Sequence, residues 1–192
     1  YMKRIFSILL FTILIPIYLN ANDLKAVVSP EPKYYAWWLR ITFMPEHKEL
    51  YGVPLNKIDP TWMLASQLKK EAIPREVLFE SGEDEMAARG IDFMQKGDFN
   101  SDNIEDLALV GVFQNLEKEQ GMFFLILTKD KNDLWKKTFL QSWLGKPGFL
   151  GLQKDGGCLA LLFCMDCGGV SEVTWDKKLK RYQMQKPADE ET

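Results

Sequence analysis

From Ile91 onward, short apolar runs alternate with polar turns along the chain. The runs have the length of strands, and Gly, Asn and Asp lie between them at intervals of about 8–12 residues. This spacing is typical of antiparallel strands joined by short turns, not of a parallel sheet covered by helices. We therefore predict a mainly β (α+β) chain with antiparallel meander sheets, arranged like propeller blades or as a small sandwich. The predicted strands cover residues 91–95, 107–113, 122–128, 135–140, 149–152, 158–164, 170–175 and 180–184.

Another strand is predicted before this region. Between Trp37 and Met44 apolar and polar positions alternate with a period of two, and Pro45 follows. Such alternation favours a half-buried strand, because successive side chains of a strand point to opposite faces. One face would carry Trp37, Leu39, Ile41 and Phe43.

One helix is predicted near residues 60–72. Asp59 can accept hydrogen bonds from the free N–H groups of a first turn, Pro60 is tolerated at the first helical position, and Pro74 ends the pattern. The apolar residues of this segment recur at helical spacing, at Trp62, Ala65, Leu68 and Ala72. The acidic stretch 81–85 that follows is predicted to be a polar connection.

The N-terminal residues have the composition of a secretory signal peptide. Lys3 and Arg4 precede an apolar run over residues 5–19, and the small residue Ala21 follows. An uncleaved anchor is the alternative, but the run of about 15 residues is shorter than the ~20 that a spanning helix needs. We expect cleavage near Ala21, a periplasmic or secreted protein, a single β-rich domain over 22–186, and a disordered acidic tail over 187–192.

Charge narrows the choice of partners. Without Lys3 and Arg4, 22 of the 24 basic residues remain against 27 acidic ones, a net charge of −5. An acidic surface without a basic block repels phosphate backbones, so nucleic acid is not expected as a partner. We expect another protein or a component of the cell envelope, and no stable membrane span after processing.

The sharpest chemical signal is an acidic loop at 97–107. Oxygen-bearing side chains fall at Asp98, Asn100, Asp102 and Asp106, and the carbonyl of Ile104 can fill the remaining gap. Several oxygens from one tight loop suit a hard cation such as calcium. An EF-hand would carry Glu twelve positions from the start, where Leu109 stands, so the loop is of another kind. A metal-free acidic turn is the alternative.

The segment Asp-Phe-Asn-Ser-Asp-Asn-Ile-Glu-Asp-Leu-Ala, within about residues 97–113, resembles the calcium loop of FG-GAP (VCBS) repeats. Such repeats occur in integrin α-subunit propellers and in many secreted bacterial proteins. The resemblance implies that Asp98, Asn100, Asp102 and Asp106 hold calcium through their side chains, and Ile104 through its carbonyl. The usual Gly is Asn103, which also tolerates a left-handed backbone. One good copy is present, whereas a full propeller needs several.

The three cysteines, Cys158, Cys164 and Cys167, share one segment. In an exported protein they predict a disulfide, and a hairpin turn favours the Cys164–Cys167 bridge, with Cys158–Cys167 as the rival. A redox Cys-x-x-Cys would need a helix after it, where Gly168 and Gly169 stand. Zinc would need a fourth ligand.

No catalytic set accompanies the loop, and His47 is the sole histidine. The predicted function is therefore that of an exported non-catalytic protein with a structural calcium loop, acting as a binding or interaction module. Two alternatives stay open. One is a periplasmic inhibitor or immunity-type protein that blocks a toxin or envelope hydrolase. The other is a metal-dependent hydrolase, which would require a base in a cleft beside the metal.

Overall fold

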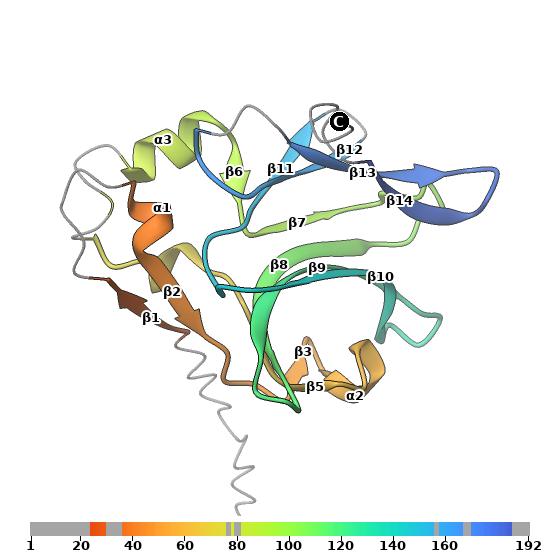
Figure 1. The fold of residues 1–192 in the computed structure, drawn as a ribbon. Coiled ribbons are helices and arrows are strands. Elements are labelled where there is room, and N and C mark those ends of the chain that lie inside the picture. Colours follow the sequence, from red (N-terminus) through yellow and green to blue (C-terminus); the bar gives the residue numbers. More distant parts are fainter. Residues whose placement is uncertain are drawn as a thin grey trace, which may run out of the picture.

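Two antiparallel sheets of five strands each form most of the structure (Figure 1). The structure, a computed structural model, describes residues 24–29, 36–75, 78, 82–155, 158–166 and 170–185. The first sheet has the order β10–β9–β8–β5, with β7 also paired to β8, and the second has the order β14–β13–β12–β11–β6. The first sheet comprises β5 (Trp62–Gln67), β7 (Met94–Gly97), β8 (Asp106–Asn115), β9 (Gln120–Lys129) and β10 (Trp135–Leu144). The second comprises β6 (Ile91–Asp92), β11 (Gly151–Asp155), β12 (Cys158–Leu162), β13 (Ser171–Asp176) and β14 (Arg181–Gln185).

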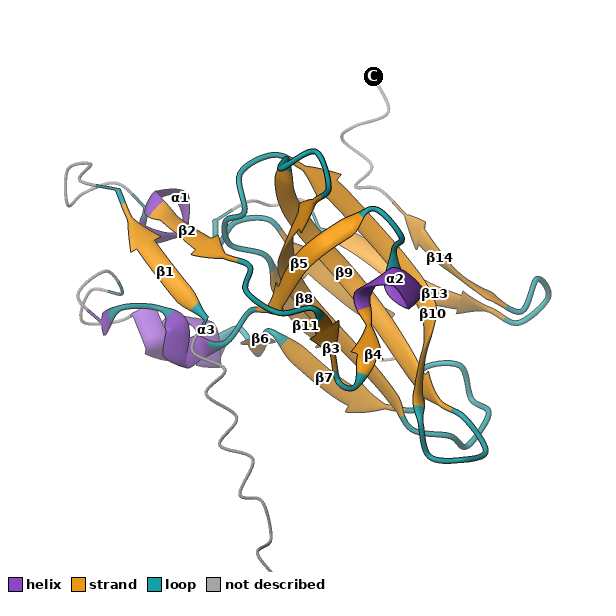
Figure 2. Cartoon of the chain, turned by 90° about the horizontal axis from the view of Figure 1, so that it is seen from below, coloured by secondary structure: helices purple, strands orange, loops and turns teal. Residues whose placement is uncertain are grey.

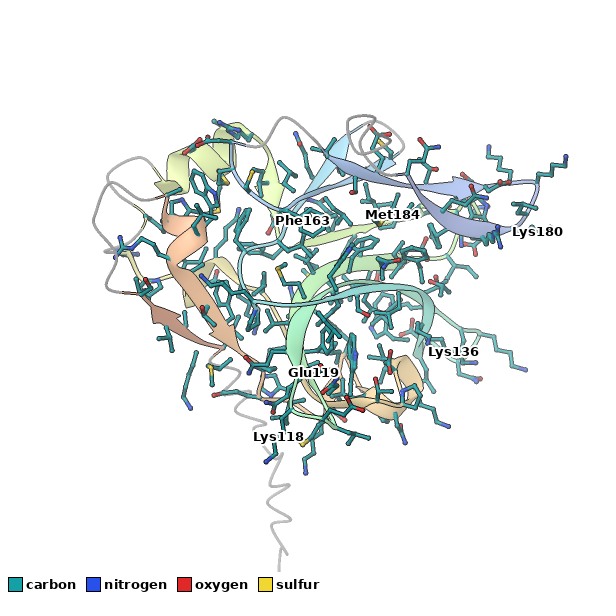
Figure 3. All side chains as sticks on the ribbon, in the orientation of Figure 1. Lys118, Glu119, Lys136, Phe163, Lys180 and Met184 are labelled. Atoms are coloured by element: carbon teal, nitrogen blue, oxygen red, sulfur yellow. The ribbon has the colours of Figure 1, made fainter. Side chains whose placement is uncertain are left out.

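The predicted antiparallel, mainly β class is confirmed. Each apolar run predicted after Ile91 forms a strand, and every strand pair in both sheets is antiparallel. The sheets pack over a shared apolar core, whose side chains fill the space between them (Figure 3). This arrangement is a sandwich-like stack.

β8 and β9 lie at the centre and are buried on both faces. Even-numbered side chains of these strands, such as Val110 and Ile126, join the core between the sheets. Odd-numbered ones, such as Leu109 and Leu125, join a second core on the outer face. Because both faces are covered, the two strands have near-continuous apolar sequences instead of alternating ones.

The second core is covered by a short outer layer. This layer consists of β3 (Glu49–Leu50), β4 (Val53–Pro54) and α2 (Leu55–Ile58), which lie across the first sheet in the view from below (Figure 2). Trp62 closes the core by stacking on Phe113, with ring centroids 4.7 Å apart and an interplanar angle of 13°. The outer layer thus buries the outer face of β8 and β9.

The chain changes sheet just before the acidic loop. Ile91 pairs with β11 of the second sheet, whereas Met94 pairs with Leu109 of β8 in the first. Phe93 lies between them, is 1% exposed, and accepts a hydrogen bond from the Val110 N–H at its carbonyl. The strand predicted over 91–95 therefore divides into β6 and β7, which anchors the start of the loop to both sheets.

The strand predicted from Trp37 to Met44 is wrong in its first half. Residues Trp37–Arg40 form one helical turn, α1, and only β2 (Ile41–Met44) is extended, paired with β1 (Lys25–Val28). Trp37 packs edge-on against Phe149 at 5.2 Å, whereas Leu39 is 58% exposed. The turn buries Trp37 and exposes Leu39, whereas a continuous strand would place both side chains on the same face.

The helix predicted near 60–72 is also wrong: Trp62–Gln67 is β5, followed by the 3₁₀ turn η1 (Lys70–Ala72). A bulge between Trp62 and Leu64 places Trp62 and Ala65 on the same face, so a strand reproduces the helical spacing. Asp59 accepts hydrogen bonds from the N–H and hydroxyl of Thr61, at 2.8 and 2.6 Å, and so forms a turn instead of a helix cap.

A short helix occupies part of the segment predicted to be a connection. This helix, α3, spans Gly82–Ala88. Met86 is 1% exposed and joins the core between the sheets, and Glu85 pairs with Arg89 at 3.0 Å one turn on. None of the helices in the described ranges is long and apolar enough to cross a membrane.

Candidate metal centre

The acidic loop connects the end of β7 to the start of β8, at residues 98–105. Two of its residues have left-handed backbones: Ser101 with φ 62° and Asn103 with φ 64°. The conformation that the family resemblance requires of Gly at position 103 is therefore adopted by Asn, for which it costs little. These two residues allow the backbone of the loop to turn tightly.

The side chains of the loop point inward and accept its own N–H groups. Asp98 accepts hydrogen bonds from the N–H of Asp102 at 3.0 Å and of Asn103 at 2.8 Å, one at each carboxylate oxygen. Asn100 Oδ1 accepts the Asp102 N–H at 2.9 Å, and Asn100 Nδ2 donates to Asp102 Oδ2 at 2.9 Å. Asp102 Oδ1 accepts the N–H of Ile104 at 2.8 Å. The first three predicted ligands thus form one connected cluster.

Asp106, the last predicted side-chain ligand, is completely buried. Its Oδ2 accepts the N–H of Phe99 at 2.9 Å and the hydroxyl of Tyr182 at 3.0 Å, and its Oδ1 accepts the hydroxyl of Thr128. Asp106 faces the core between the sheets because it shares the even-numbered face of β8, opposite Thr128 in the register with β9. Three donors compensate its burial, as a buried charge requires.

The pKa of Tyr182 is affected by the negative charges of the acidic loop. Its pKa is raised well above the usual value, mainly by burial, then by the charge of Asp106 and their hydrogen bond, and further by the charges of Asp102 and Asp98. All three carboxylates therefore act on one hydroxyl. A divalent cation in this loop would offset their mutual repulsion.

The donor chemistry of the loop fits calcium. A carboxylate oxygen has two lone pairs, so each oxygen of Asp98 and Asp102 that accepts one hydrogen bond keeps one for a cation, as does Oδ1 of Asp106. Asp106 Oδ2 accepts two hydrogen bonds and is filled. Within the described ranges, however, no three His, Cys, Asp or Glu side chains are gathered as a metal-binding group. Binding would require the carboxylates to turn toward a common point.

Ile104 donates its N–H within the loop, and its side chain is 41% exposed. The calcium-binding role of the Ile104 carbonyl stays a prediction. Two contributors to the site lie outside the predicted set: Thr128 and Tyr182. Only Thr128 could have been found from sequence, by pairing the predicted strands 107–113 and 122–128 in register; nothing local points to Tyr182.

The other predicted features lie partly outside the described residues. Cys164 is buried and disulfide-bonded, but Cys167 lies outside the described ranges, so the Cys164–Cys167 pairing stays a prediction. The signal peptide over 1–21 and the tail over 187–192 lie outside them as well. His47 forms an isolated β-bridge with Ala65.

Comparisons of the chain with known protein families, curated proteins and solved structures found no match. The resemblance of residues 97–113 to FG-GAP loops therefore depends on the residues quoted for it and stays a prediction.

Proposed function

We propose that the protein is an exported, non-catalytic binding protein in which the acidic loop holds one structural calcium ion. The observation that carries the proposal is that Asp98, Asn100 and Asp102 are connected by hydrogen bonds within one turn. Asp98, Asn100 and Asp102 turn into the loop, and Asp106 lies beneath it.

The residues that would hold calcium are Asp98, Asn100, Asp102 and Asp106 through their side chains, and Ile104 through its carbonyl. When bound, the ion would supply positive charge to a cluster of carboxylates and fix the entrance of β8. Asp106 connects this entrance to both sheets, because its partners Thr128 and Tyr182 belong to β9 and β14. The ion's expected effect is thus on the stability of the sandwich.

A binding role is inferred from three features taken together. The N-terminal residues have the composition of a signal peptide, the predicted mature chain is acidic, and the loop is exposed at 101–105. An exposed, rigid loop held on a buried scaffold is a common way to present a recognition surface. The partner class proposed is another protein or a component of the cell envelope.

Thermal unfolding with and without calcium tests the proposal. For a Kd on the order of 10⁻⁴–10⁻³ M, calcium at ten times Kd should add about 1.4 kcal/mol, which corresponds to a Tm increase of about 3–6 °C. Asp98→Ala should lose this increase relative to its own metal-free Tm.

Asp130→Ala is the matched control. Asp130 also accepts two N–H groups of its own turn, from Asn132 at 2.8 Å and Leu134 at 3.1 Å, but it lies outside the loop. It should keep the calcium effect. An unchanged Tm for the wild type, or an equal increase in Asp98→Ala, would contradict the proposal.

A further inference from the structure

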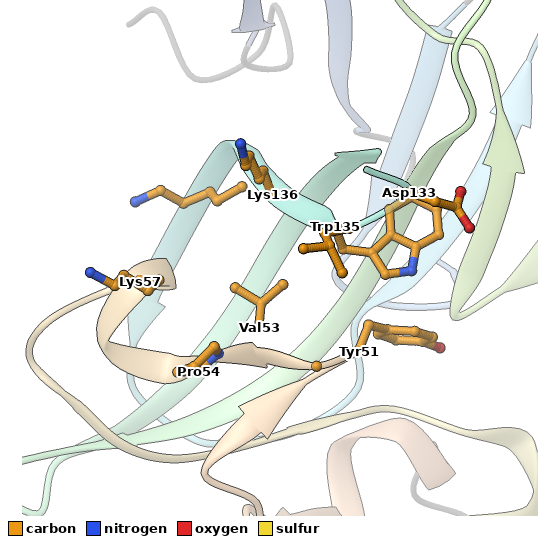
Figure 4. A pocket seen from close by; sticks show the side chains of 10 residues that line it. Tyr51, Val53, Pro54, Lys57, Asp133, Trp135 and Lys136 are labelled. Carbon is orange, nitrogen blue, oxygen red and sulfur yellow. The ribbon is translucent and has the colours of Figure 1, made fainter. Parts of the chain in front are cut away.

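A pocket of about 520 Å³ lies between the outer layer and the start of β10 (Figure 4). On one side it is lined by the β3–β4 turn and α2, including Tyr51, Val53 and Lys57, and on the other by Trp135 and its neighbours Lys136 and Lys137. Its volume is within the range of about 300–1,000 Å³ usual for small-molecule sites. The pocket is separate from the acidic loop.

One wall is Tyr51, which has an unfavourable backbone conformation. Tyr51 and Gly52 form the two-residue turn of the β3–β4 hairpin, with φ 53° and 76°. Such turns require left-handed residues at both positions, where Asn or Gly is preferred and an aromatic residue is not. The Tyr51 hydroxyl donates to Gln67 Oε1 and contacts Met94 Sδ at 3.0 Å, which fixes the ring.

The other wall is Trp135. The Nζ of Lys129 lies 5.2 Å from the centroid of its ring, within the range of a cation–π contact. Lys129 in turn pairs with Asp133 at 2.9 Å and with Glu105 at 3.5 Å. In the close view the Tyr51 and Trp135 rings, which come from opposite walls, lie at the same end of the pocket, with Lys57 and Lys136 toward the other end (Figure 4). The indole is therefore held in place without a ligand.

The charge of the lining is positive. Lys136 is paired with Asp130 at 2.8 Å, but Lys137 donates to the carbonyl of Ile58, which leaves its charge uncompensated by an acid. No ion pair involves Lys57 in the described ranges. The one acidic residue of the lining, Asp133, is already occupied by Lys129.

We propose that this pocket binds a small aromatic anion, with its ring against Tyr51 and Trp135 and its carboxylate or sulfonate toward Lys57 and Lys137. Stacking and charge together define the ligand class, because aromatic pairs favour a flat ring and an ammonium group favours an anion. A sugar fits less well, since the lining offers few groups that could bond to several hydroxyls. The pocket shares no lining residue with the acidic loop, although Lys129 contacts both Trp135 and Glu105.

Calorimetric titration with 2-naphthoate and with its neutral analogue 2-naphthalenemethanol tests the proposal on the full chain. The anion should bind about tenfold or more tightly than the alcohol. Lys57→Gln should weaken 2-naphthoate several-fold and leave the alcohol unchanged, whereas Lys177→Gln, in the distant β13–β14 turn, should change neither.

Tyr51→Asn is the decisive variant, because Asn suits a left-handed backbone and the hairpin turn should still form. We expect a Tm within a few degrees of the wild type and at least about tenfold weaker binding of both probes. Equal affinity for the two probes, or undiminished binding by Tyr51→Asn, would overturn the proposal.

Discussion

The hydroxyl of Tyr182 donates to Asp106 Oδ2 over 3.0 Å and so joins the two sheets through a buried carboxylate. Tyr182 belongs to β14 of the second sheet and Asp106 to β8 of the first. The same oxygen accepts the N–H of Phe99 at 2.9 Å, which ties the acidic loop to the pair. The entrance of β8 therefore depends on a residue 76 positions away in the chain.

Tyr182→Phe should reduce the free energy of unfolding by about 1.5–3 kcal/mol, because it removes a buried donor from a charged acceptor. Urea-induced unfolding at neutral pH measures this loss. Tyr51→Phe is the control, since it removes a hydroxyl whose bond is to a neutral acceptor near the surface, and it should cost less than about 1.5 kcal/mol. Equal losses in the two variants would show that the buried pair has no special weight.

Alkaline pH should destabilise the protein through the same tyrosine. Its pKa is raised in the folded state by burial and by Asp106, so above the ordinary value of about 10 the unfolded chain releases a proton that the folded chain keeps. The stability that the protonated hydroxyl contributes is present below pH 10 and declines as pH rises further, by up to about 1.4 kcal/mol per pH unit.

Comparison of the wild type with Tyr182→Phe isolates this contribution, because the lysines titrate alike in both. Unfolding measured in urea from pH 8 to 11 should give a steeper decline for the wild type above pH 10. Parallel curves would show that Tyr182 ionises equally easily in both states.

Gly111 allows Phe123 and the edge of β5 to approach β8. A Cβ at this position would lie 2.3 Å from Phe123 Cζ and 2.4 Å from the backbone oxygen of Ser66. Gly111→Ala should therefore cost about 1–3 kcal/mol or more in unfolding free energy. Gly148→Ala is the matched control, because its nearest neighbour would be 3.7 Å away. The explanation fails if calorimetry gives the two variants the same Tm.

The strands after Ile91 are the part of the fold that the sequence predicts best. Their apolar runs are separated by turn residues, and a run such as 107–113 has the length of a strand and is too short for a typical helix. Periodicity could not show that the odd and even residues of β8 enter two different cores. That division depends on the outer layer at 49–58, where strands of two residues each are too short to show a periodic pattern of apolar residues.

The sequence predicts the fold least well where pairing between strands overrides the local spacing of apolar residues. A bulge places Trp62 and Ala65 on the same face of a strand, and this strand, β5, pairs with β8. Tertiary pairing therefore outweighs the local helical spacing. The loop side chains were assigned from spacing alone because consecutive ligands share one turn. Tyr182 could not be assigned to the site from spacing, because its contact with Asp106 forms only when the two sheets pack together.

Calcium binding to the acidic loop can be measured by isothermal titration calorimetry. We expect one site per chain with a Kd on the order of 10⁻⁴–10⁻³ M, weakened at least about tenfold by Asp102→Asn. Asp59→Asn should bind like the wild type, because Asp59 accepts the N–H and hydroxyl of Thr61 at the opposite end of β8, where Trp62 pairs with Asn115. Absence of binding at about 10 mM calcium, or undiminished affinity in Asp102→Asn, would contradict the claim that the acidic loop is a calcium site.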